Sequence, residues 1–265
     1  MYKHERQTKI LELVSANGFH STEDLADKLG VSQVTLYRDL KEMEEAGSIQ
    51  KQYGGVVPVK KFVSNIDFKV REAINTVEKE AIAEKAVELI EDGDSFFLDT
   101  STTCLFLARK LMEKKRKNLT IITNSCRIIL MLEDEPEYRT ICTGGTYLKK
   151  LDLLVGSPAE EFIQTLNAKK YFFSATGISH EGCADTDSGE TRIKKLIVSR
   201  VQQKILLADH TKFNQMATFR TVGPAEIDIL ITDSLTPQKK LAPFIEHNVQ
   251  IIQAPLPAKE PSTPA

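Results

Sequence analysis

A hydroxyl-rich segment and a lysine-bearing segment are the parts of this sequence best suited to binding an anion. Asp99 is followed by four consecutive hydroxyl residues, Thr100–Thr103, and a helical pattern begins there. Hydroxyls and the free N–H groups of a helix N-terminus together suit a phosphate group. For any single loop of this kind, a capped helix without a ligand is the commoner explanation. The segment 209–212 ends in a lysine, which would complete an anion site if it faced the hydroxyls.

Carboxylate and lysine side chains also occur at spacings that permit acid–base chemistry. Glu190 and Lys194 lie four residues apart near the start of an expected helix. Such a pair is most often a surface ion pair worth about 0.3–0.5 kcal/mol. In an enzyme, Glu190, Asp209 and Lys212 would be able to serve as acid, base and phosphate clamp.

A different chemistry, the reading of nucleic acid, is indicated by residues 31–43. Ser32 occupies an N-cap position, and Val31 and Leu36 have the spacing of a hydrophobic staple. Leu36, Leu40 and Met43 repeat at i, i+4 and i+7 and therefore form one buried stripe. The opposite face and its flanks carry groups that suit phosphates and base edges, namely Gln33, Val34, Thr35, Tyr37, Arg38 and Lys41.

The residues before this helix favour DNA binding over an ordinary amphipathic helix. Ser21 can cap a preceding helix with Asp24 three residues on, and Gly30 suits its C-terminal end. Two short helices joined by a turn that contains glycine form a helix-turn-helix, in which the second helix reads DNA.

Further elements must support these two helices. Residues 4–16 have the apolar spacing of a first helix, and the short apolar runs that flank Gly54-Gly55 predict a hairpin. Three helices and a hairpin make a winged helix-turn-helix, assigned to residues 1–59, whose wing offers Lys51 and Tyr53 to DNA. Residues 60–76 are charged and weakly periodic, so we expect a linker there that runs into a helix.

Residues 77–253 have a different pattern of apolar and polar residues. Short apolar runs end in polar residues or glycine, and amphipathic helical stretches separate most of them. This pattern predicts an α/β fold with a mainly parallel sheet buried on both faces. The expected strands lie at 95–98, 120–122, 139–142, 172–175, 205–207 and 229–231, and the expected helices at 78–91, 104–115, 125–134, 158–168 and 190–202. Since ligands bind outside the carboxyl ends of such strands, all the polar ends should face one crevice.

The totals exclude several classes of protein. With 265 residues, a net charge of -2 and 27% charged residues, the chain has no global basic field, so a strong non-specific nucleic-acid binder is disfavoured. We find no signal-peptide pattern and no membrane-length apolar run, and expect a cytoplasmic protein with no membrane partner, no cofactor and no metal site. The prolines after residue 254 predict a disordered tail, 254–265. The cysteines fit buried apolar positions, and they are Cys104, Cys126, Cys142 and Cys183.

The N-terminal pattern resembles the DeoR family of bacterial transcription regulators. The matching residues are Glu5-Arg6, Ile10, Val14, Gly18, Leu25-Ala26, Val31-Ser32, Thr35, Arg38-Asp39-Leu40, Glu44, Gly47 and Tyr53-Gly54-Gly55. Tyr37 stands where the family usually has arginine, and Tyr53 stands where it often has histidine. The resemblance implies that this region binds operator DNA.

The C-terminal region resembles the effector domain of the same family, which is similar to ribose-5-phosphate isomerase and glucosamine-6-phosphate deaminase. The resemblance implies a phosphorylated sugar or related metabolite as effector. The expected effector-binding residues are Asp99, Ser101, Thr102, Thr103, Asn124, Ser125, Gly144, Gly145, Gly177, Glu190, Lys194, Asp209 and Lys212. Ser101, Ser174 and Ser179 depart from the family pattern, so the identity of the sugar does not carry over.

Two functions follow from these patterns. The first is a regulator, expected to be a repressor of sugar-metabolism genes whose operator affinity changes when a phosphorylated sugar binds. The second is a sugar-phosphate isomerase or deaminase with an added N-terminal domain. The helix-turn-helix pattern is the most specific in the chain, and a fold does not carry its chemistry with it, so we expect no enzyme and no catalytic residue. One recognition helix covers one half-site, so we expect a homodimer or a homotetramer.

Overall fold

The computed structural model describes residues 3–17, 19–45, 49–58 and 68–257. By its internal contacts the chain divides into an N-terminal unit, Met1–Lys61, and a C-terminal unit, Phe62–Ala265. Residues 60–67 of the predicted linker lie outside the described residues, and 68–76 contain the helix α4, a two-residue turn and the first residue of α5. The predicted tail also lies outside them from residue 258 onward, and its first residue, Ala254, ends a strand.

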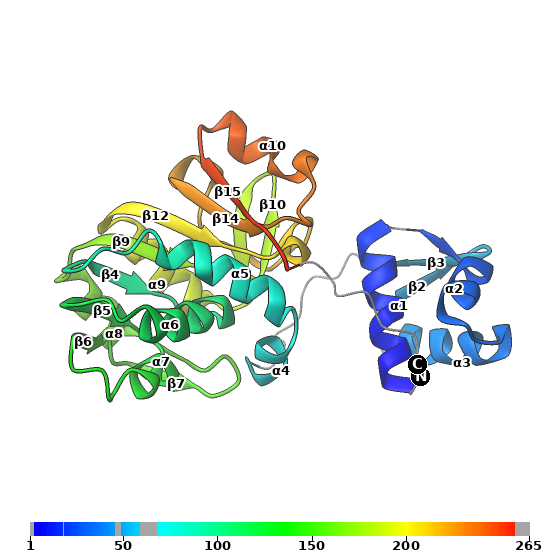
Figure 1. The fold of residues 1–265 in the computed structure, drawn as a ribbon, viewed down its shortest axis with the longest axis horizontal. Coiled ribbons are helices and arrows are strands. Elements are labelled where there is room, and N and C mark those ends of the chain that lie inside the picture. The colour runs from blue at the N-terminus through cyan, green and yellow to red at the C-terminus, as the bar shows by residue number, and fades with distance from the viewer. Residues whose placement is uncertain (1–2, 18, 46–48, 59–67, 258–265) are drawn as a thin grey trace. The chain divides into compact units, whose positions relative to one another are not determined.

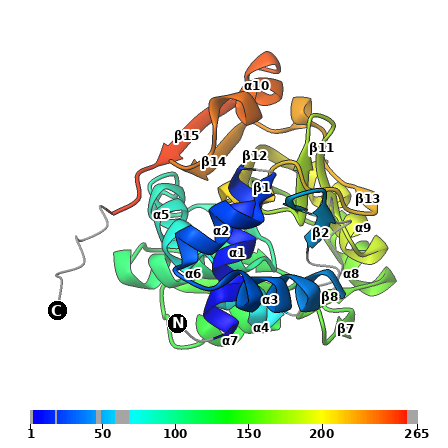
Figure 2. The ribbon, with the colours of Figure 1, turned by 90° about the vertical axis from the view of Figure 1, so that its right-hand side faces the viewer.

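The N-terminal unit is the predicted winged helix-turn-helix. Its helices and strands surround one apolar core, which includes Ile10, Leu36 and Leu40 (Figure 2). The strands form an antiparallel sheet in the order β1-β3-β2. The bounds are α1 Lys3–Asn17, β1 His20–Ser21, α2 Thr22–Leu29, α3 Gln33–Glu45, β2 Ile49–Gln52 and β3 Gly55–Pro58.

Local hydrogen bonds explain where α2 and α3 begin and end. Ser21 Oγ accepts from the backbone N–H of Asp24 at 3.1 Å, as an N-cap does. Gly30 ends α2 in the left-handed region at φ +63°, which a side chain would disfavour. Ser32 Oγ then accepts from Thr35 N at 3.3 Å and starts α3. The predicted helix ends at Ser21, Gly30 and Ser32 are therefore confirmed.

The C-terminal unit is built on a seven-stranded parallel sheet in the order β15-β14-β12-β9-β4-β5-β6. Each strand contains a run of two or more consecutive apolar residues, as expected for a sheet covered on both faces. They are β4 Ser95–Leu98, β5 Leu119–Thr123, β6 Tyr138–Cys142, β9 Ala168–Phe173, β12 Val201–Leu207, β14 Ile229–Asp233 and β15 Gln250–Ala254.

Helices cover both faces of this sheet, so the unit has three layers (Figure 1). One face packs against α5, α6 and α7 through residues such as Phe96 and Phe172. The other face packs against α8, α9 and α10 through residues such as Phe97 and Tyr171. The helices are α4 Phe68–Ala73, α5 Thr76–Val87, α6 Thr102–Lys114, α7 Cys126–Met131, α8 Ser157–Gln164, α9 Ser188–Val198 and α10 Gln238–Glu246.

The sequence pattern did not predict the short antiparallel elements at the edge of the sheet. These strands are β7 Thr146–Leu148 with β8 Leu153–Val155, and β10 Gly177–Ser179 with β11 Gly182–Asp185 and β13 Phe219–Arg220. Strand β15 was also missed: it has only two consecutive large apolar residues, Ile251 and Ile252, and it lies at the predicted end of the domain. The helix expected over 125–134 is shorter in the structure, Cys126–Met131, and the one expected over 190–202 ends at Val198.

Candidate functional site

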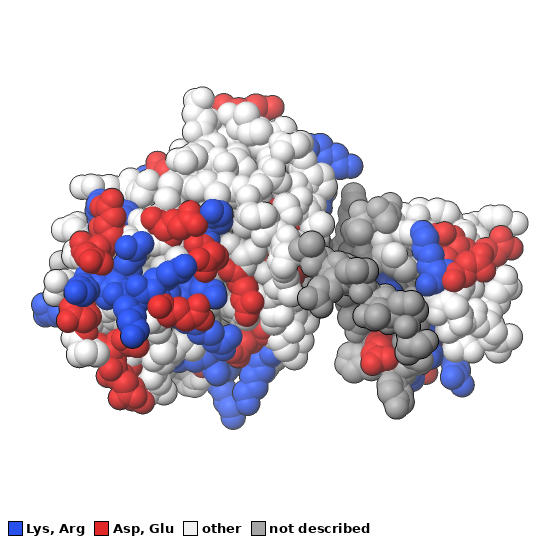
Figure 3. All heavy atoms as spheres, viewed as in Figure 1, with Lys and Arg blue, Asp and Glu red and all other residues white. Residues whose placement is uncertain are grey.

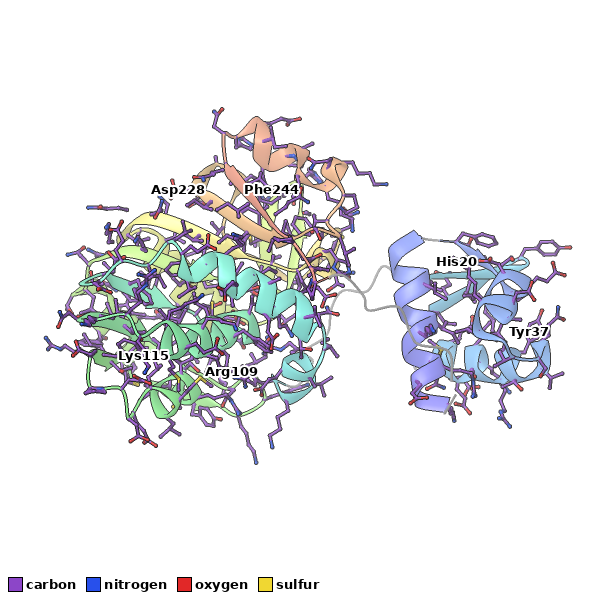
Figure 4. All side chains as sticks on the ribbon, viewed as in Figure 1. His20, Tyr37, Arg109, Lys115, Asp228 and Phe244 are labelled. Atoms are coloured by element: carbon purple, nitrogen blue, oxygen red, sulfur yellow. The ribbon has the colours of Figure 1, made fainter. Side chains whose placement is uncertain are left out.

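The outer face of α3 is exposed along its whole length. Val34 is 81% exposed and Tyr37, labelled in Figure 4, is 51% exposed, although one is apolar and the other aromatic. Gln33, Arg38 and Lys41 are also exposed, and Thr35 is half-buried. Exposed apolar side chains beside cations and amides suit contact with base methyl groups and phosphates. The structure therefore places the predicted DNA-reading residues of α3 on one accessible face.

An ion pair holds α3 against α1. Arg6 Nε lies 2.7 Å from Asp39 Oδ2, and the Asp39 carboxylate is fully buried. The hydrogen bond to Asp39 raises the pKa of Arg6, so the guanidinium stays charged. Asp39 lies next to Arg38 in the sequence, about 100° farther around the helix, where it is buried while Arg38 is exposed. The Arg6–Asp39 contact thus fixes how α3 is rotated against α1 and where its exposed face points.

The wing presents one aromatic residue and one paired cation. Tyr53, at the hairpin turn, is fully exposed. Lys51 Nζ lies 3.3 Å from Glu44 Oε2, and the Lys51 N–H donates to Glu44 Oε1 at 3.0 Å. Lys51 is therefore tied to the C-terminal turn of α3, while Tyr53 is the accessible group of the wing.

A second candidate site lies at the carboxyl ends of β4 and β9. The chain order reverses between these neighbouring strands, because β5 and β6 lie on one side and β12, β14 and β15 on the other. Connections on opposite faces leave a crevice at such a point, and ligands of α/β sheets bind there. Asp99 follows β4, Ser174 follows β9, and the two strand ends are joined because Asp99 Oδ2 accepts from Ser174 N at 3.1 Å.

Lys194 of α9 is buried at this point among carboxylates. Its Nζ lies 2.9 Å from Asp185 Oδ2, 3.0 Å from Glu190 Oε1 and 3.6 Å from Asp99 Oδ2. It also donates to the carbonyl of Ser174 at 2.8 Å. Lys194 is only 2% exposed, so its pair with Glu190 is not the surface pair that the spacing alone suggests.

The ionisation of this cluster follows from burial and charge. Burial alone would lower the pKa of Lys194, but the carboxylates of Asp185, Asp99 and Glu190 raise it well above its usual value. Burial raises the pKa of Glu190 to about 7, and Lys194 opposes that shift. With one ammonium group among Asp99, Asp185 and Glu190, this part of the pocket is rich in hydrogen-bond acceptors.

A third strand end, that of β12, is followed by a lysine. Asp209, after β12, accepts through Oδ1 from Thr211 N at 3.0 Å and from Asn75 Nδ2 at 3.2 Å. Its other oxygen, Oδ2, is buried without a hydrogen-bond partner. Lys212 is half-buried, and within the described residues its amine makes no hydrogen bond or ion pair. Burial lowers the pKa of Lys212, and Asp209 opposes this.

The polar groups of several predicted effector residues are used in contacts within the fold. Ser101 Oγ accepts from Cys104 N at 3.2 Å and Ser125 Oγ accepts from Ile128 N at 3.3 Å, so both cap helices. Thr102 and Thr103 are buried at the start of α6. Asn124 donates to the Leu154 carbonyl at 3.1 Å.

The predicted glycines allow close packing of the backbone. A Cβ at Gly145 would lie 2.5 Å from the Val155 carbonyl oxygen, and one at Gly177 would lie 2.6 Å from that of Gln215. A Cβ at Gly144 would meet no neighbouring atom, but the φ of +71° lies in the left-handed region, which favours glycine. Gly145 and Gly177 therefore allow two backbone segments to pack closely beside the site.

Sequence reasoning missed the residues that complete the cluster. Asp185 ends β11, holds Lys194 and accepts from Thr176 N at 2.9 Å. Tyr171 is buried in β9 with its hydroxyl unpartnered, and burial raises its pKa. The signal that could have found Asp185 is an aspartate at the end of an otherwise apolar run, directly before a helix.

Other features of the described residues limit the chemistry. No group of three or more His, Cys, Asp and Glu side chains in the described parts is placed to hold a metal ion. None of the helices described there is both long and apolar enough to cross a bilayer. Cys104 and Cys183 are buried as expected, but Cys142 is exposed and Cys126 half-buried, so the prediction of four buried cysteines was wrong for these two.

Charges are intermixed on the face of the C-terminal unit seen in Figure 3. Glu84 of α5, for example, lies 2.5 Å from Lys114 Nζ and 4.0 Å from Lys110 Nζ. Such a surface presents no extended field of one sign.

Comparison with known proteins places both units in one family. Residues 6–62 match the DeoR-like helix-turn-helix domain, and residues 74–234 match the DeoR C terminal sensor domain. The chain belongs to the DeoR family of transcriptional regulators. It is therefore a DNA-binding regulator that joins a helix-turn-helix domain to a sensor domain.

DeoR-family relatives match nearly the full chain. The HTH-type regulator YulB of Bacillus subtilis (strain 168), itself described as uncharacterized, is 32% identical over 95% of this chain and 97% of its own length. The HTH-type regulator GlpR of Haloferax volcanii is 35% identical over 86% and 89%. The glycerol-3-phosphate regulon repressor of Escherichia coli (strain K12) is 30% identical over 95% and 99%.

Solved structures show weaker likeness to this DeoR-family chain. Ribose 5 phosphate isomerase A from Neisseria gonorrhoeae aligns with a TM-score of 0.36 and 18% identity, over 51% of this chain and 52% of that one. The delta subunit of eIF2B from Chaetomium thermophilum aligns with a TM-score of 0.48 and 9% identity, over 86% and 70%.

Proposed function

We propose that this regulator represses genes of sugar metabolism and that a phosphorylated sugar bound in its C-terminal unit changes its affinity for operator DNA. The observation that carries the proposal is one chain with two sites: an exposed recognition helix, and a crevice that holds acceptors and an unpaired lysine. The matched relatives include a glycerol-3-phosphate regulon repressor and a lactose phosphotransferase system repressor, which supports a sugar-related effector.

The proposed ligand has hydroxyl groups at one end and a phosphate at the other. Sugar hydroxyls would donate to the carboxylates of Asp99, Glu190 and Asp209. In Asp209 the Oδ2 atom has no hydrogen-bond partner. A phosphate carries about -1.5 to -2 charge at neutral pH and needs cations and N–H donors. We assign this role to Lys212 and the hydroxyl loop 101–103, because Lys194 is already surrounded by carboxylates.

We infer that the chain acts without turnover. Lys194 and Glu190 are paired with each other, and the residues at the strand ends are occupied by helix caps and backbone contacts. The matched relatives are HTH-type regulators and repressors, which favours the regulator over the alternative of a sugar-phosphate isomerase or deaminase. We further infer a cytoplasmic homodimer or homotetramer, since paired half-sites raise affinity and specificity.

One pair of assays tests this function. Purified protein should bind the DNA upstream of its own operon far more tightly than a shuffled sequence of equal length. The same preparation should leave ribose 5-phosphate and glucosamine 6-phosphate unchanged on prolonged incubation. Turnover of either sugar, together with no preference among DNA sequences, would favour the enzyme.

A further inference from the structure

Two of the four cysteines lie near neighbouring strand ends at one corner of the C-terminal unit. Cys142 is the last residue of β6 and is exposed, whereas Cys126 is the first residue of α7, shortly after the end of β5, and is half-buried. Strands β5 and β6 pair in parallel, so their carboxyl ends lie side by side. Both thiols are free. Cysteine is among the residue types most often fully buried, so two accessible thiols at one corner need an explanation.

The register of the sheet places Cys142 on the face that α7 covers. Cys142 is the register partner of Thr123, and the next residue, Thr143, donates its N–H to the Thr123 carbonyl at 3.1 Å. Side chains alternate between the two faces along a strand, so Cys142 shares a face with Tyr138. Tyr138 belongs to the apolar cluster that also contains the buried residues of α7, and α7 packs against β6 as well as β5. Both cysteines therefore lie on the same side of the sheet.

A tight turn keeps Cys126 close to this pair of strand ends. Thr123 Oγ1 accepts from Ser125 N at 3.1 Å, which folds the chain back immediately before Cys126. Neighbouring strands are about 4.7–4.9 Å apart, and a disulfide joins Cα atoms about 4.4–6.8 Å apart. The spacing between the two strand ends therefore falls within the span of a disulfide. In agreement, burial raises the pKa of Cys126 and the nearby Cys142 raises it further.

The surroundings of the two thiols suit different steps of an oxidation. The thiolate is the reactive form of cysteine, and an oxidant in solution reaches an exposed thiol first, which here is Cys142. Cys126 is less accessible, and the carboxylate of Asp152 adds to the rise in its pKa. Asp152 is itself held 2.6 Å from Arg127 Nε. Cys126 is therefore better placed to react with an oxidised neighbour than with an oxidant in solution.

We propose that Cys126 and Cys142 form an oxidisable thiol pair, which hydrogen peroxide converts into a disulfide between the start of α7 and the end of β6. The Cys142 thiolate attacks one peroxide oxygen, so that an S–O bond forms, the O–O bond breaks, and the departing hydroxide takes up the thiol proton as water. The Cys126 thiolate then attacks the sulfur of this sulfenic acid. The S–S bond forms, the S–O bond breaks, and the hydroxide leaves with the Cys126 proton as a second water. The two thiols lose two electrons and the peroxide gains them, and an added dithiol reverses the bond by exchange.

The disulfide would restrain α7, which is a short helix. Cys126 is its first residue, and the helix has only 6 residues, so a bond to β6 limits the opening of most of it. Hydrogen exchange of the α7 amides should therefore become slower on oxidation and return to its former rate on reduction. This inference goes beyond the regulatory function proposed above, because the bond depends on neither DNA nor a sugar phosphate.

Peptide mass spectrometry of the full chain tests the thiol pair directly. The protein is treated with hydrogen peroxide, its remaining thiols are blocked with iodoacetamide, and it is digested with trypsin without reductant. Trypsin releases the two cysteines on separate peptides, 118–127 and 140–149. We expect these peptides joined, at a mass lower by two hydrogen atoms than their sum, and complete loss of the joined species after dithiothreitol. Non-reducing electrophoresis should show that the bond lies within one chain.

Three variants complete this test. Cys142→Ser should abolish the joined peptide, and Cys126→Ser should leave Cys142 as a sulfenic acid that dimedone traps. Cys183→Ala removes a buried thiol and is the matched control, which should form the joined peptide as wild type does. The inference is overturned if peroxide leaves both thiols free, or if oxidised Cys142 ends as a sulfinic acid or a bond between chains without bonding Cys126. Absence of any response of operator binding to sugar phosphates would refute the proposed function and leave this thiol pair standing.

Discussion

Lys194 and Lys212 lie at the same edge of the sheet but contribute differently to the charge of the pocket. Lys194 is enclosed by Asp99, Asp185 and Glu190 and needs no further anion. Asp209 and, more weakly, Asp185 act on Lys212, and within the described residues its amine is unpaired. In the proposed effector site the two lysines would therefore have separate roles: Lys194 would order acceptors for hydroxyl groups, and Lys212 would offer a cation to an anion.

Arg38 is predicted to bind DNA and to contribute little to folding. It is exposed on α3, opposite the buried stripe of Leu36, Leu40 and Met43. Arg38→Ala should weaken operator binding by about 1–3 kcal/mol if it reads a base through two hydrogen bonds. A phosphate contact alone would weaken binding evenly across sequences. Fluorescence anisotropy with operator and mutated operators measures both.

The control for Arg38 is Lys9→Ala, which removes an exposed cation from α1. The control variant should bind operator nearly as wild type does. Operator affinity of Arg38→Ala equal to that of wild type would show that α3 does not read DNA through this residue.

Glu190 should make stability depend on pH in a definite direction. Burial raises its pKa to about 7, above the value near 4.3 of an unfolded glutamate. The folded state therefore holds the proton more tightly, and this contribution to stability is complete below about pH 4.3 and lost as pH rises through about 7. Glu190→Gln keeps the hydrogen-bonding shape without the charge. The stability of Glu190→Gln relative to that of wild type should therefore increase from pH 5 to pH 8.

Urea unfolding at the two pH values measures this difference. Glu161→Gln, at an exposed position on α8, serves as the control and should track wild type at both. An equal stability difference between Glu190→Gln and wild type at pH 5 and pH 8 would mean that Glu190 does not change protonation in this range.

Residue types predicted the pocket better than they predicted its contacts. Asp99, Asp209 and Lys212 were expected after strand ends, and Glu190 and Lys194 near the start of a helix. The structure brings Asp99, Glu190 and Lys194 within one cluster. Asp185 was missed because it lies on a short antiparallel strand that no alternation reveals. Asn75, which donates to Asp209, was missed because it was assigned to a linker. Both residues are placed by tertiary contacts, which a local sequence pattern does not contain.

At the scale of elements, the orientation of α3 depends on one buried ion pair. Arg6 of α1 holds Asp39 from the side of α3 that faces the core. Asp39→Ala would leave the Arg6 guanidinium without that partner in a partly desolvated position. Hydrogen exchange of α3 amides should become faster, and that of α9 amides should stay as in wild type.

Glu45→Ala, an exposed substitution on the same helix, is the comparison for this test. Unchanged exchange of α3 in Asp39→Ala would show that the apolar stripe alone fixes the helix. Faster exchange in α9 as well would mean that the variant had lost its fold in general.

Helices with clear caps and buried strands were the elements that sequence predicted well. Ser21, Gly30 and Ser32 mark ends that local chemistry decides. Strands β7, β8, β10, β11 and β13 escaped because each is only two to four residues long and has no period to read. The strand order was also beyond the sequence, since it depends on which crossovers pack against which face.

At the scale of the whole molecule, one recognition helix in each chain implies an assembly of chains. Two half-sites bound together gain affinity through the effective concentration of the second. Sedimentation should therefore show a dimer or a tetramer at micromolar concentration. Sedimentation at the mass of a single 29.7 kDa chain, both with and without operator DNA, would contradict this.

The central claim is that occupation of the crevice by a phosphorylated sugar changes DNA affinity, and one titration tests it directly. Operator binding by wild type is measured while candidate sugar phosphates are added, beside Lys212→Ala and the exposed control Lys239→Ala. We predict that one sugar phosphate changes operator affinity of wild type and of the control by about 5- to 150-fold, as allosteric coupling commonly does. Lys212→Ala should bind operator normally and fail to respond. If Lys212→Ala responds at the same sugar phosphate concentration as wild type, the effector binds elsewhere and the assignment of the pocket is wrong.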